Sequence, residues 1–247
     1  MRTALLADIH SNLEALQACL AHARREGAER FAFLGDLLGY GADPLACLDI
    51  VAGLVAAGSP AVRGNHDDAC LGGILPGMSY AARDAIYWTR DRLGPRERDF
   101  LAGLPLAVNE EDRLYVHASA DRPEAWTYIT GAQEASHAFA ATKARILFVG
   151  HVHHPLLYFT TPGGEPRPFQ PVPGVPLPLS EFRRWLVIVG SVGQPRDGNP
   201  AACYAIHDPA AGTLTHYRVP YDVQATATKI LGAGLPERLA WRLIAGE

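Results

Sequence analysis

A chain of 247 residues is long enough for one large or two small domains, and 48% of its residues are hydrophobic, as in ordinary globular proteins. The formal net charge is −4 and there is no block of lysine and arginine, so the composition does not favour nucleic acid as a partner. No apolar run approaches the ~18 residues needed to cross a bilayer, and the first residues lack the charged and apolar regions of a signal peptide. We therefore expect a cytoplasmic protein that is not attached to a membrane and whose four cysteines are reduced core residues.

The first 62 residues alternate between short apolar runs and helical patterns. We predict strands at Thr3–Ala7, Phe31–Leu34 and Ala61–Val62. The capping box Ser11–Glu14 opens a helix that continues to about Arg25, and Asp43 with Pro44 opens a second helix that ends at Ala57. This order predicts parallel strands with right-handed crossovers, in which ligands gather beyond the carboxyl ends of the strands.

The remainder of the chain mixes hairpins, helices and further strands. We predict helices at 78–101 (with a break at Gly94-Pro95), 131–144, 223–231 and 236–244. We predict hairpins at 106–116 and 202–219, and further strands at 145–149, 156–160 and 185–189. The segment 162–178 holds seven prolines, so we expect an irregular excursion that cannot join a central sheet.

Polar side chains of one chemical kind follow five of the predicted strands. They are Asp8 and His10, Asp36, Asn65 and His66, His117, and His151, His153 and His154. Neutral imidazole is the commonest metal ligand among side chains. Each residue alone has a simpler reading, because histidines at strand ends often serve as hydrogen-bonded structural residues and aspartates often cap helices or form turns. Five such strand ends together predict a metal-binding cleft.

In chain order these residues form the blocks Asp8-x-His10, Gly35-Asp36, Gly64-Asn65-His66-Asp67, His117 and Gly150-His151-x-His153. This series resembles the signature of the calcineurin-like metallophosphoesterase superfamily and covers the chain from Asp8 to about Asp197. Asp36 is followed by Leu-Leu-Gly-Tyr40, without the Asp-Arg-Gly continuation of eukaryotic-type Ser/Thr phosphatases, and Asp67 stands where those enzymes carry Glu. The resemblance is therefore to the small prokaryotic branch. It implies an α/β fold, a four-layer α-β-β-α sandwich, as a single domain over residues 1–247 with the proline-rich excursion at 162–178.

The same resemblance implies a role for each residue of the blocks. Two divalent metal ions (Mn, Fe, Zn, Ni or Co) would be bound, the first by Asp8, His10 and His153 and the second by Asn65, His117 and His151, with Asp36 bridging them. His66 would be the general acid, with Asp67 orienting its ring. Ser191, Gln194 and Arg196 would contact substrate, as would Asn12, although a turn in the loop and the entry into a helix are competing readings. His154 lies outside the signature, and we place it at the edge of the cleft.

Hydrolysis of a phosphate ester needs positive charge on the non-bridging oxygens and a strong nucleophile at neutral pH, and a pair of divalent metals supplies both. We therefore expect an enzyme that hydrolyses a small phosphorylated substrate, with a phosphodiester favoured, by a hydroxide bridging two metals. A phosphomonoesterase, a protein phosphatase and a dinucleoside polyphosphate hydrolase stay open as alternatives. Two alternatives belong to other functional classes. A nuclease would need a row of basic residues leading to the cleft, and the acidic net charge disfavours it. A non-catalytic metal-binding regulatory module would have an incomplete ligand set or lack His66, and neither is seen. The sequence leaves the substrate, the metals and the oligomeric state open.

Overall fold

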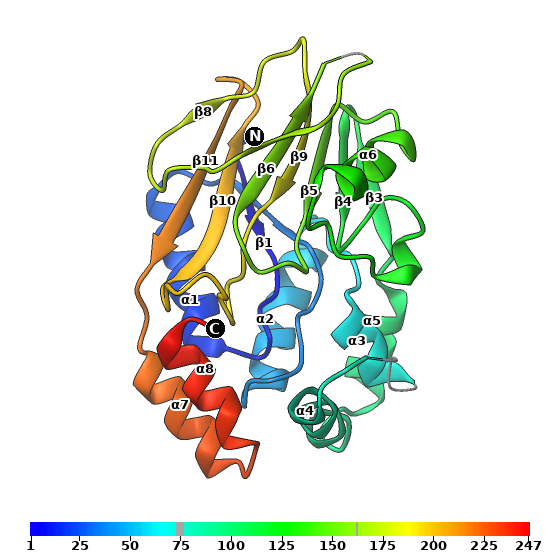
Figure 1. Cartoon of the computed structure of the whole chain (residues 1–247). Helices are drawn as coiled ribbons and strands as arrows, with labels where there is room; N and C mark the ends of the chain where they lie inside the picture. Colours follow the sequence, from blue (N-terminus) through cyan, green and yellow to red (C-terminus); the bar gives the residue numbers. More distant parts are fainter. Residues whose placement is uncertain (73–76, 162) are drawn as a thin grey trace.

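The computed structural model describes residues 1–72, 77–161 and 163–247 and arranges them as two β-sheets with helices packed outside them (Figure 1). The first sheet has the strand order β2-β1-β10-β11-β8. Its strands are β1 (Thr3–Leu6), β2 (Arg30–Phe33), β8 (Leu177–Pro178), β10 (Ala202–Asp208) and β11 (Thr213–Val219). β1 and β2 are parallel, as predicted, whereas β10 pairs antiparallel with β1. The strand predicted at 61–62 is reduced to a single bridge between Ala61 and Phe33.

The second sheet has the strand order β3-β4-β5-β9-β6-β7. Its strands are β3 (Ala107–Glu110), β4 (Arg113–Val116), β5 (Ile146–Val149), β6 (Leu156–Thr160), β7 (Arg167–Phe169) and β9 (Arg184–Ile188). β4, β5 and β9 run parallel at the centre of this sheet. The carboxyl ends of these three strands therefore lie at one edge.

The helices are α1 (Leu13–Arg25), α2 (Pro44–Ala56), α3 (Asn65–Leu71), α4 (Tyr80–Arg90), α5 (Pro95–Gly103), α6 (Ala132–Ala140), α7 (Val223–Gly232) and α8 (Glu237–Ala245), with a 3-10 turn at Pro123–Ala125. The N-cap of α1 is Asn12 and not Ser11, because the Asn12 side chain accepts a hydrogen bond from the Ala15 N–H. The sequence did not lead us to expect α3, which begins at a predicted ligand block. Over the described ranges, none of these helices combines the length and apolar character needed to span a membrane.

Three hydrophobic clusters separate the layers. Leu5 of β1 packs between the sheets with Phe148 and Val187, while its neighbour Leu6 faces α1 and α2. A further cluster joins the second sheet to Phe139 of α6. Successive residues of a strand point to opposite faces, so short apolar runs can serve two layers at once. The predicted α-β-β-α sandwich is thereby confirmed.

The proline-rich segment joins both sheets at their outer edges, so the prediction of an irregular excursion was wrong in part. β7 pairs antiparallel with β6, and β8 pairs antiparallel with β11, each as the last strand of its sheet. Proline has no N–H to give to a ladder and is tolerated at such edges. Pro168 and Pro178 occupy these two strands, and residue 162, where the predicted excursion begins, lies outside the described residues.

Candidate metal centre

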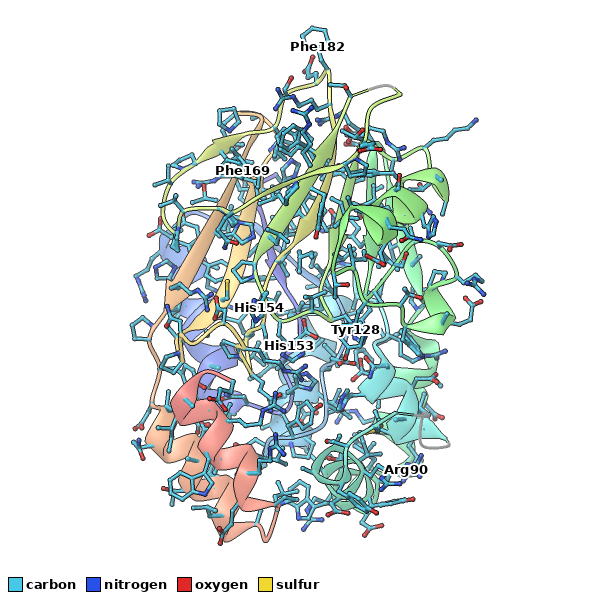
Figure 2. The ribbon with its side chains drawn as sticks, viewed as in Figure 1. Arg90, Tyr128, His153, His154, Phe169 and Phe182 are labelled. Atoms are coloured by element: carbon cyan, nitrogen blue, oxygen red, sulfur yellow. The ribbon has the colours of Figure 1, made fainter. Side chains whose placement is uncertain are left out.

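The predicted ligands meet where the central strands end. Asp8 and His10 follow β1, Asp36 follows β2, Asn65 begins α3, His117 follows β4, and His151 and His153 follow β5. Figure 2 shows His153 near the middle of the molecule, at the lower ends of the strands in this view. Parallel strands present their carboxyl ends together, so residues distant in the sequence gather there.

The backbone at these positions adopts a conformation that side chains other than glycine rarely take. Asp8, His10, Asp36, His151 and His153 have φ angles between 51° and 65°. The left-handed region costs roughly 1–2 kcal/mol for each such residue. Main-chain hydrogen bonds of 3.0 Å, from Asp8 N to Gly35 O and from His10 N to Asp36 O, hold the two loops in place. Backbone of this kind clusters at functional sites, where the surrounding structure enforces it.

Two glycines are required by the close approach of ligand carboxylates. A Cβ at Gly64 would lie 2.2 Å from Oδ1 of Asp36, and one at Gly150 would lie 2.7 Å from Oδ2 of Asp8. Gly64 and Gly150 therefore each make room for a carboxylate that follows a different strand.

The first of two clusters consists of Asp8, His10, Asp36 and His153, all buried. Nε2 of His10 lies 3.2 Å from Nε2 of His153 and 3.7 Å from Oδ2 of Asp36. Nε2 of His153 lies 3.2 Å from Oδ1 of Asp8. The Asp8 carboxylate is held by the His151 N–H, 2.9 Å from Oδ2.

The second cluster consists of Asp36, His117 and His151, together with Asn65. Nε2 of His117 lies 3.1 Å from Nδ1 of His151, 3.1 Å from Oδ1 of Asn65 and 3.4 Å from Oδ2 of Asp36. The same oxygen of Asp36 therefore faces both clusters. Its other oxygen, Oδ1, accepts the His66 N–H at 2.8 Å.

Each of the four imidazoles has its outer nitrogen against a main-chain carbonyl oxygen. The contacts are His10 Nδ1 to Leu38 O (3.0 Å), His117 Nδ1 to Leu34 O (2.7 Å), His151 Nε2 to Trp126 O (2.9 Å) and His153 Nδ1 to Gln194 O (2.6 Å). A carbonyl only accepts, so the outer nitrogens carry the hydrogen and the inner nitrogens of neutral rings carry lone pairs. Metal-binding histidines are oriented in this way.

The donor set fits divalent metal ions. Inner atoms of neighbouring ligands lie 3.1–3.7 Å apart, and ligand atoms at about 2.1 Å from one ion are themselves roughly 3.0–3.4 Å apart. Buried lone pairs facing each other repel unless a cation or a proton lies between them. Mixed imidazole and oxygen ligands suit the transition metals expected from the sequence.

Protonation differs between the clusters. Burial lowers the pKa of His10 and of His153, so both rings are neutral at pH 7. Burial also acts to lower the pKa of His117, but the Asp36 carboxylate outweighs it and raises that pKa to about 9. In turn, although burial opposes its charge, the His117 imidazolium holds the pKa of Asp36 well below its usual range.

His66 lies beside the clusters, and among the described residues the Asp67 carboxylate forms no hydrogen bond with its ring. The carboxylate of Asp67 accepts the Leu38 N–H at 3.1 Å and the Gly64 N–H at 3.0 Å, and burial raises its pKa to about 7. Nδ1 of His66 has no hydrogen-bond partner among the described residues. Asp67 therefore joins two loops through hydrogen bonds to their main-chain N–H groups. Its predicted role, to orient the His66 ring, stays a prediction.

Two of the residues predicted to contact substrate form hydrogen bonds within the protein instead. The buried Asn12 side chain caps α1 and donates to Gly193 O at 2.9 Å and to Tyr221 Oη at 3.1 Å. The buried Ser191 hydroxyl donates to Asp8 O and accepts the Gln194 N–H. Both residues hold the ligand loops together, and their positions give no support to the prediction that they bind substrate.

A cavity of about 660 Å³ adjoins the second cluster. Its lining includes Tyr40, Asn65, His66, Glu124, Trp126, Tyr128, His151, Arg196 and Arg242. Of the predicted substrate contacts, Arg196 lies in this lining, whereas the Gln194 side chain accepts hydrogen bonds from Arg196. His154 is exposed, and its ring contacts the main-chain oxygen of Arg196. Sequence reasoning missed Trp126, Tyr128 and Arg242, which stand in no motif block; only Tyr40 lies near one.

Comparison with known proteins agrees with this geometry. A model of the calcineurin-like phosphoesterase superfamily domain matches residues 1–212. The chain is 34% identical over 249 residues to an uncharacterized protein of Methanocaldococcus jannaschii, covering 99% of this chain and 98% of that protein. The structure of this chain is similar to that of a metallophosphoesterase from Sphaerobacter thermophilus, with a TM-score of 0.88 and 38% identity over 100% of this chain and 99% of that one. A hypothetical protein from Pyrococcus horikoshii shares the fold, with a TM-score of 0.79 and 20% identity over 100% and 98% of the two chains.

Proposed function

This chain belongs to the calcineurin-like phosphoesterase superfamily, and we propose that it uses two divalent metal ions to hydrolyse a small phosphodiester. The family and the buried Asp/His clusters support a metal-dependent phosphoesterase. The observation that carries the two-metal proposal is the Oδ2 atom of Asp36, which lies 3.7 Å from Nε2 of His10 and 3.4 Å from Nε2 of His117. One carboxylate oxygen between two ligand clusters is the arrangement that holds two cations close together.

The first ion would be held by Asp8, His10 and His153, the second by Asn65, His117 and His151, with Asp36 shared. When bound, divalent cations neutralise the non-bridging oxygens of the phosphate and lower the pKa of a water molecule, which provides a nucleophile. Asn65 contributes an amide oxygen without charge, so the centre stays more electropositive than it would with a further carboxylate.

The His66 imidazole would donate a proton to the leaving oxygen as its bond to phosphorus breaks. The His66 ring lines the cavity, and the main-chain N–H of His66 donates to Asp36. This hydrogen bond fixes the position of the proton donor relative to the shared ligand. Burial lowers the pKa of His66. A bound anionic phosphate would favour the charged imidazolium again and so prepare the proton for transfer.

The substrate would be an ester with a substantial organic group. A bare phosphate would fill only a small part of the cavity of about 660 Å³ beside the centre. We favour a diester because its single negative charge needs fewer cations than the dianion of a monoester.

The test compares bis(p-nitrophenyl) phosphate and p-nitrophenyl phosphate with the manganese-loaded protein. We expect faster hydrolysis of the diester, and we expect Asp36→Asn to lower kcat/KM by more than about a hundredfold, because loss of even an outer partner of a metal ligand costs about 10–100-fold. Asp99→Asn, a change of the same kind at an exposed site on α5, is the matched control. An Asp36→Asn variant with wild-type activity would contradict the two-metal proposal, and preference for the monoester would contradict the choice of a diester.

A further inference from the structure

The cavity beside the candidate metal centre is walled by segments from distant parts of the chain. The centre and α3 supply His151, Asn65 and His66. The opposite lining comes from the segment after the 3-10 turn, from the loop after β9 and from α8, through Trp126, Tyr128, Arg196 and Arg242. A phosphate held at the centre leaves the rest of its molecule in contact with this second wall.

One guanidinium group in that wall, Arg196, has no carboxylate partner within the part of the chain described, whereas Arg242 has the negative charge of Glu247 close to it. Arg196 donates to Oε1 of Gln194 at 3.0 and 3.3 Å, and Arg242 donates through Nε to the main-chain oxygen of Glu247 at 2.9 Å. Burial and the nearby charge of Arg196 both lower the pKa of Arg242. One acidic side chain, the exposed Glu124, also lines the cavity, but it forms no ion pair with either arginine. The wall therefore holds the Arg196 guanidinium without a carboxylate partner, beside Arg242, whose charge Glu247 compensates in part.

An aromatic surface lies between the arginines and the ligands. The Tyr128 ring stacks on the ring of His151 with centroids 3.9 Å apart and planes at 26°, and Tyr128 is 48% exposed. Figure 2 shows Tyr128 at the same end of the strands as His153. The main-chain oxygen of Trp126 accepts a hydrogen bond from the ring Nε2–H of His151, which fixes this segment against the centre. An aromatic ring held rigidly at a cavity wall suits stacking by a planar group.

We propose that the cavity selects a nucleotide that carries a second phosphate, with Tyr128 stacking on its base and with Arg196 and Arg242 binding that second phosphate. The position of the first phosphate, at the ligand clusters, rests on the function proposed above. Guanidinium groups bind phosphate through paired hydrogen bonds and stay charged when partly buried. A nucleotide with one phosphate would leave Arg196 without an anion.

Arg242 belongs to α8, which lies beyond the residues 1–212 matched by the family model. The hairpin of α7 and α8 is fixed to the body of the protein, because Nζ of Lys229 on α7 lies 2.5 Å from Glu14 and 2.8 Å from Asp43. In Figure 1 this hairpin lies below the strands, on the same side as α1. The part matched by the family model thus contains the ligands together with Tyr128 and Arg196, and the C-terminal hairpin adds Arg242.

The test measures nucleotide binding to the manganese-loaded protein by titration calorimetry, so that the readout is affinity and not turnover. The probes are AMP, ADP and pyrophosphate. We expect ADP to bind at least about tenfold more tightly than AMP, the size expected of one charge-assisted hydrogen-bonded contact. Arg242→Met should reduce this preference to about twofold or less, and Arg242→Lys should retain part of it. Tyr128→Ala should weaken ADP binding roughly tenfold and leave pyrophosphate binding unchanged.

Arg238→Met is the matched control, because Arg238 is an exposed arginine on the same helix and does not line the cavity. It should keep the wild-type preference for ADP, which excludes a general effect of net charge. Equal affinity of the wild type for AMP and ADP, or an unchanged preference in Arg242→Met, would overturn the inference. A wild type that hydrolyses no phosphodiester but shows the expected binding pattern would overturn the proposed function alone.

Discussion

The two ligand clusters share Asp36 and each contains two imidazoles, yet they differ in what lies between the inner nitrogens of those imidazoles. In the first, Nε2 of His10 and Nε2 of His153 lie 3.2 Å apart, and burial lowers the pKa of both rings. Two lone pairs therefore face each other. In the second, the pKa of about 9 keeps a proton on His117, whose Nε2 points at Asn65 and His151, 3.1 Å from each.

On the two-metal proposal, this difference predicts two classes of metal site. A cation entering the first cluster displaces no proton from His10 or His153 and relieves the repulsion between their lone pairs. A cation entering the second must replace the proton of His117. Asn65 and His151 also line the cavity, whereas His10 and His153 do not. We infer a tightly held first metal, and a second metal that depends on pH and faces the substrate.

The largest expected effect comes from removing one imidazole from each cluster. We expect His153→Ala and His117→Ala each to lose more than about a hundredfold in activity, because each removes a ligand outright. After dialysis, elemental analysis should find that His117→Ala retains the first metal and that His153→Ala does not. His137→Ala, at an exposed position on α6, should retain wild-type metal content and activity. Loss of both metals from His117→Ala, with both kept by His153→Ala, would reverse the comparison.

The members of both clusters could be predicted from the sequence, because each lies directly after a short apolar run or opens a helix after a glycine. The hydrogen bonds of the residues that hold the ligand loops together could not be predicted. Asp67 bonds Leu38 N and Asn12 bonds Gly193 O and Tyr221 Oη, and these contacts depend on how loops from different strands pack. Arg242 was missed for the same reason: an arginine on an amphipathic C-terminal helix carries no sign of the cavity that it lines.

The fold was predictable where hydrophobic periodicity was strong. β6 was predicted with its observed bounds, and the break before Pro95 separates α4 from α5 as expected. Prediction failed where tertiary packing decides. Ala61 pairs only through one bridge, α3 is a short helix whose first turn is devoted to the centre, and β7 is a strand only because an edge of the second sheet accepts it.

A smaller effect should appear in the pH dependence of stability of the metal-free protein. The pKa of His117 is about 9 in the folded protein and about 6.5 in the unfolded chain. The contribution of His117 to the free energy of unfolding is therefore complete below pH 6.5 and is lost as the pH rises to 9. The contribution is about 3 kcal/mol at most. His153, with a lowered pKa, acts in the opposite sense: unfolded chains take up its proton below pH 6.5, so the fold loses stability as the pH falls.

Urea unfolding in the presence of a chelator measures both contributions with the two alanine variants. The destabilisation caused by His117→Ala should shrink between pH 6.5 and 9. That caused by His153→Ala should stay constant over this range and shrink only below pH 6.5. Parallel curves for the two variants would show that the clusters titrate alike, contrary to the comparison.

The smallest effect expected is the release of about one proton when the second metal binds. At pH 8 most of His117, with a pKa of about 9, is protonated, whereas Asp67, with a pKa of about 7, is mostly ionised. Metal titrations by calorimetry in two buffers of different ionisation enthalpy count the protons that each binding step releases. The first step should release none from His10 or His153, and the second about one, with its affinity rising about tenfold per pH unit up to pH 9. His117→Ala should abolish the second release, because no other imidazole of the centre carries a proton to displace at this pH; an equal release in both steps would mean that protons occupy the two clusters alike.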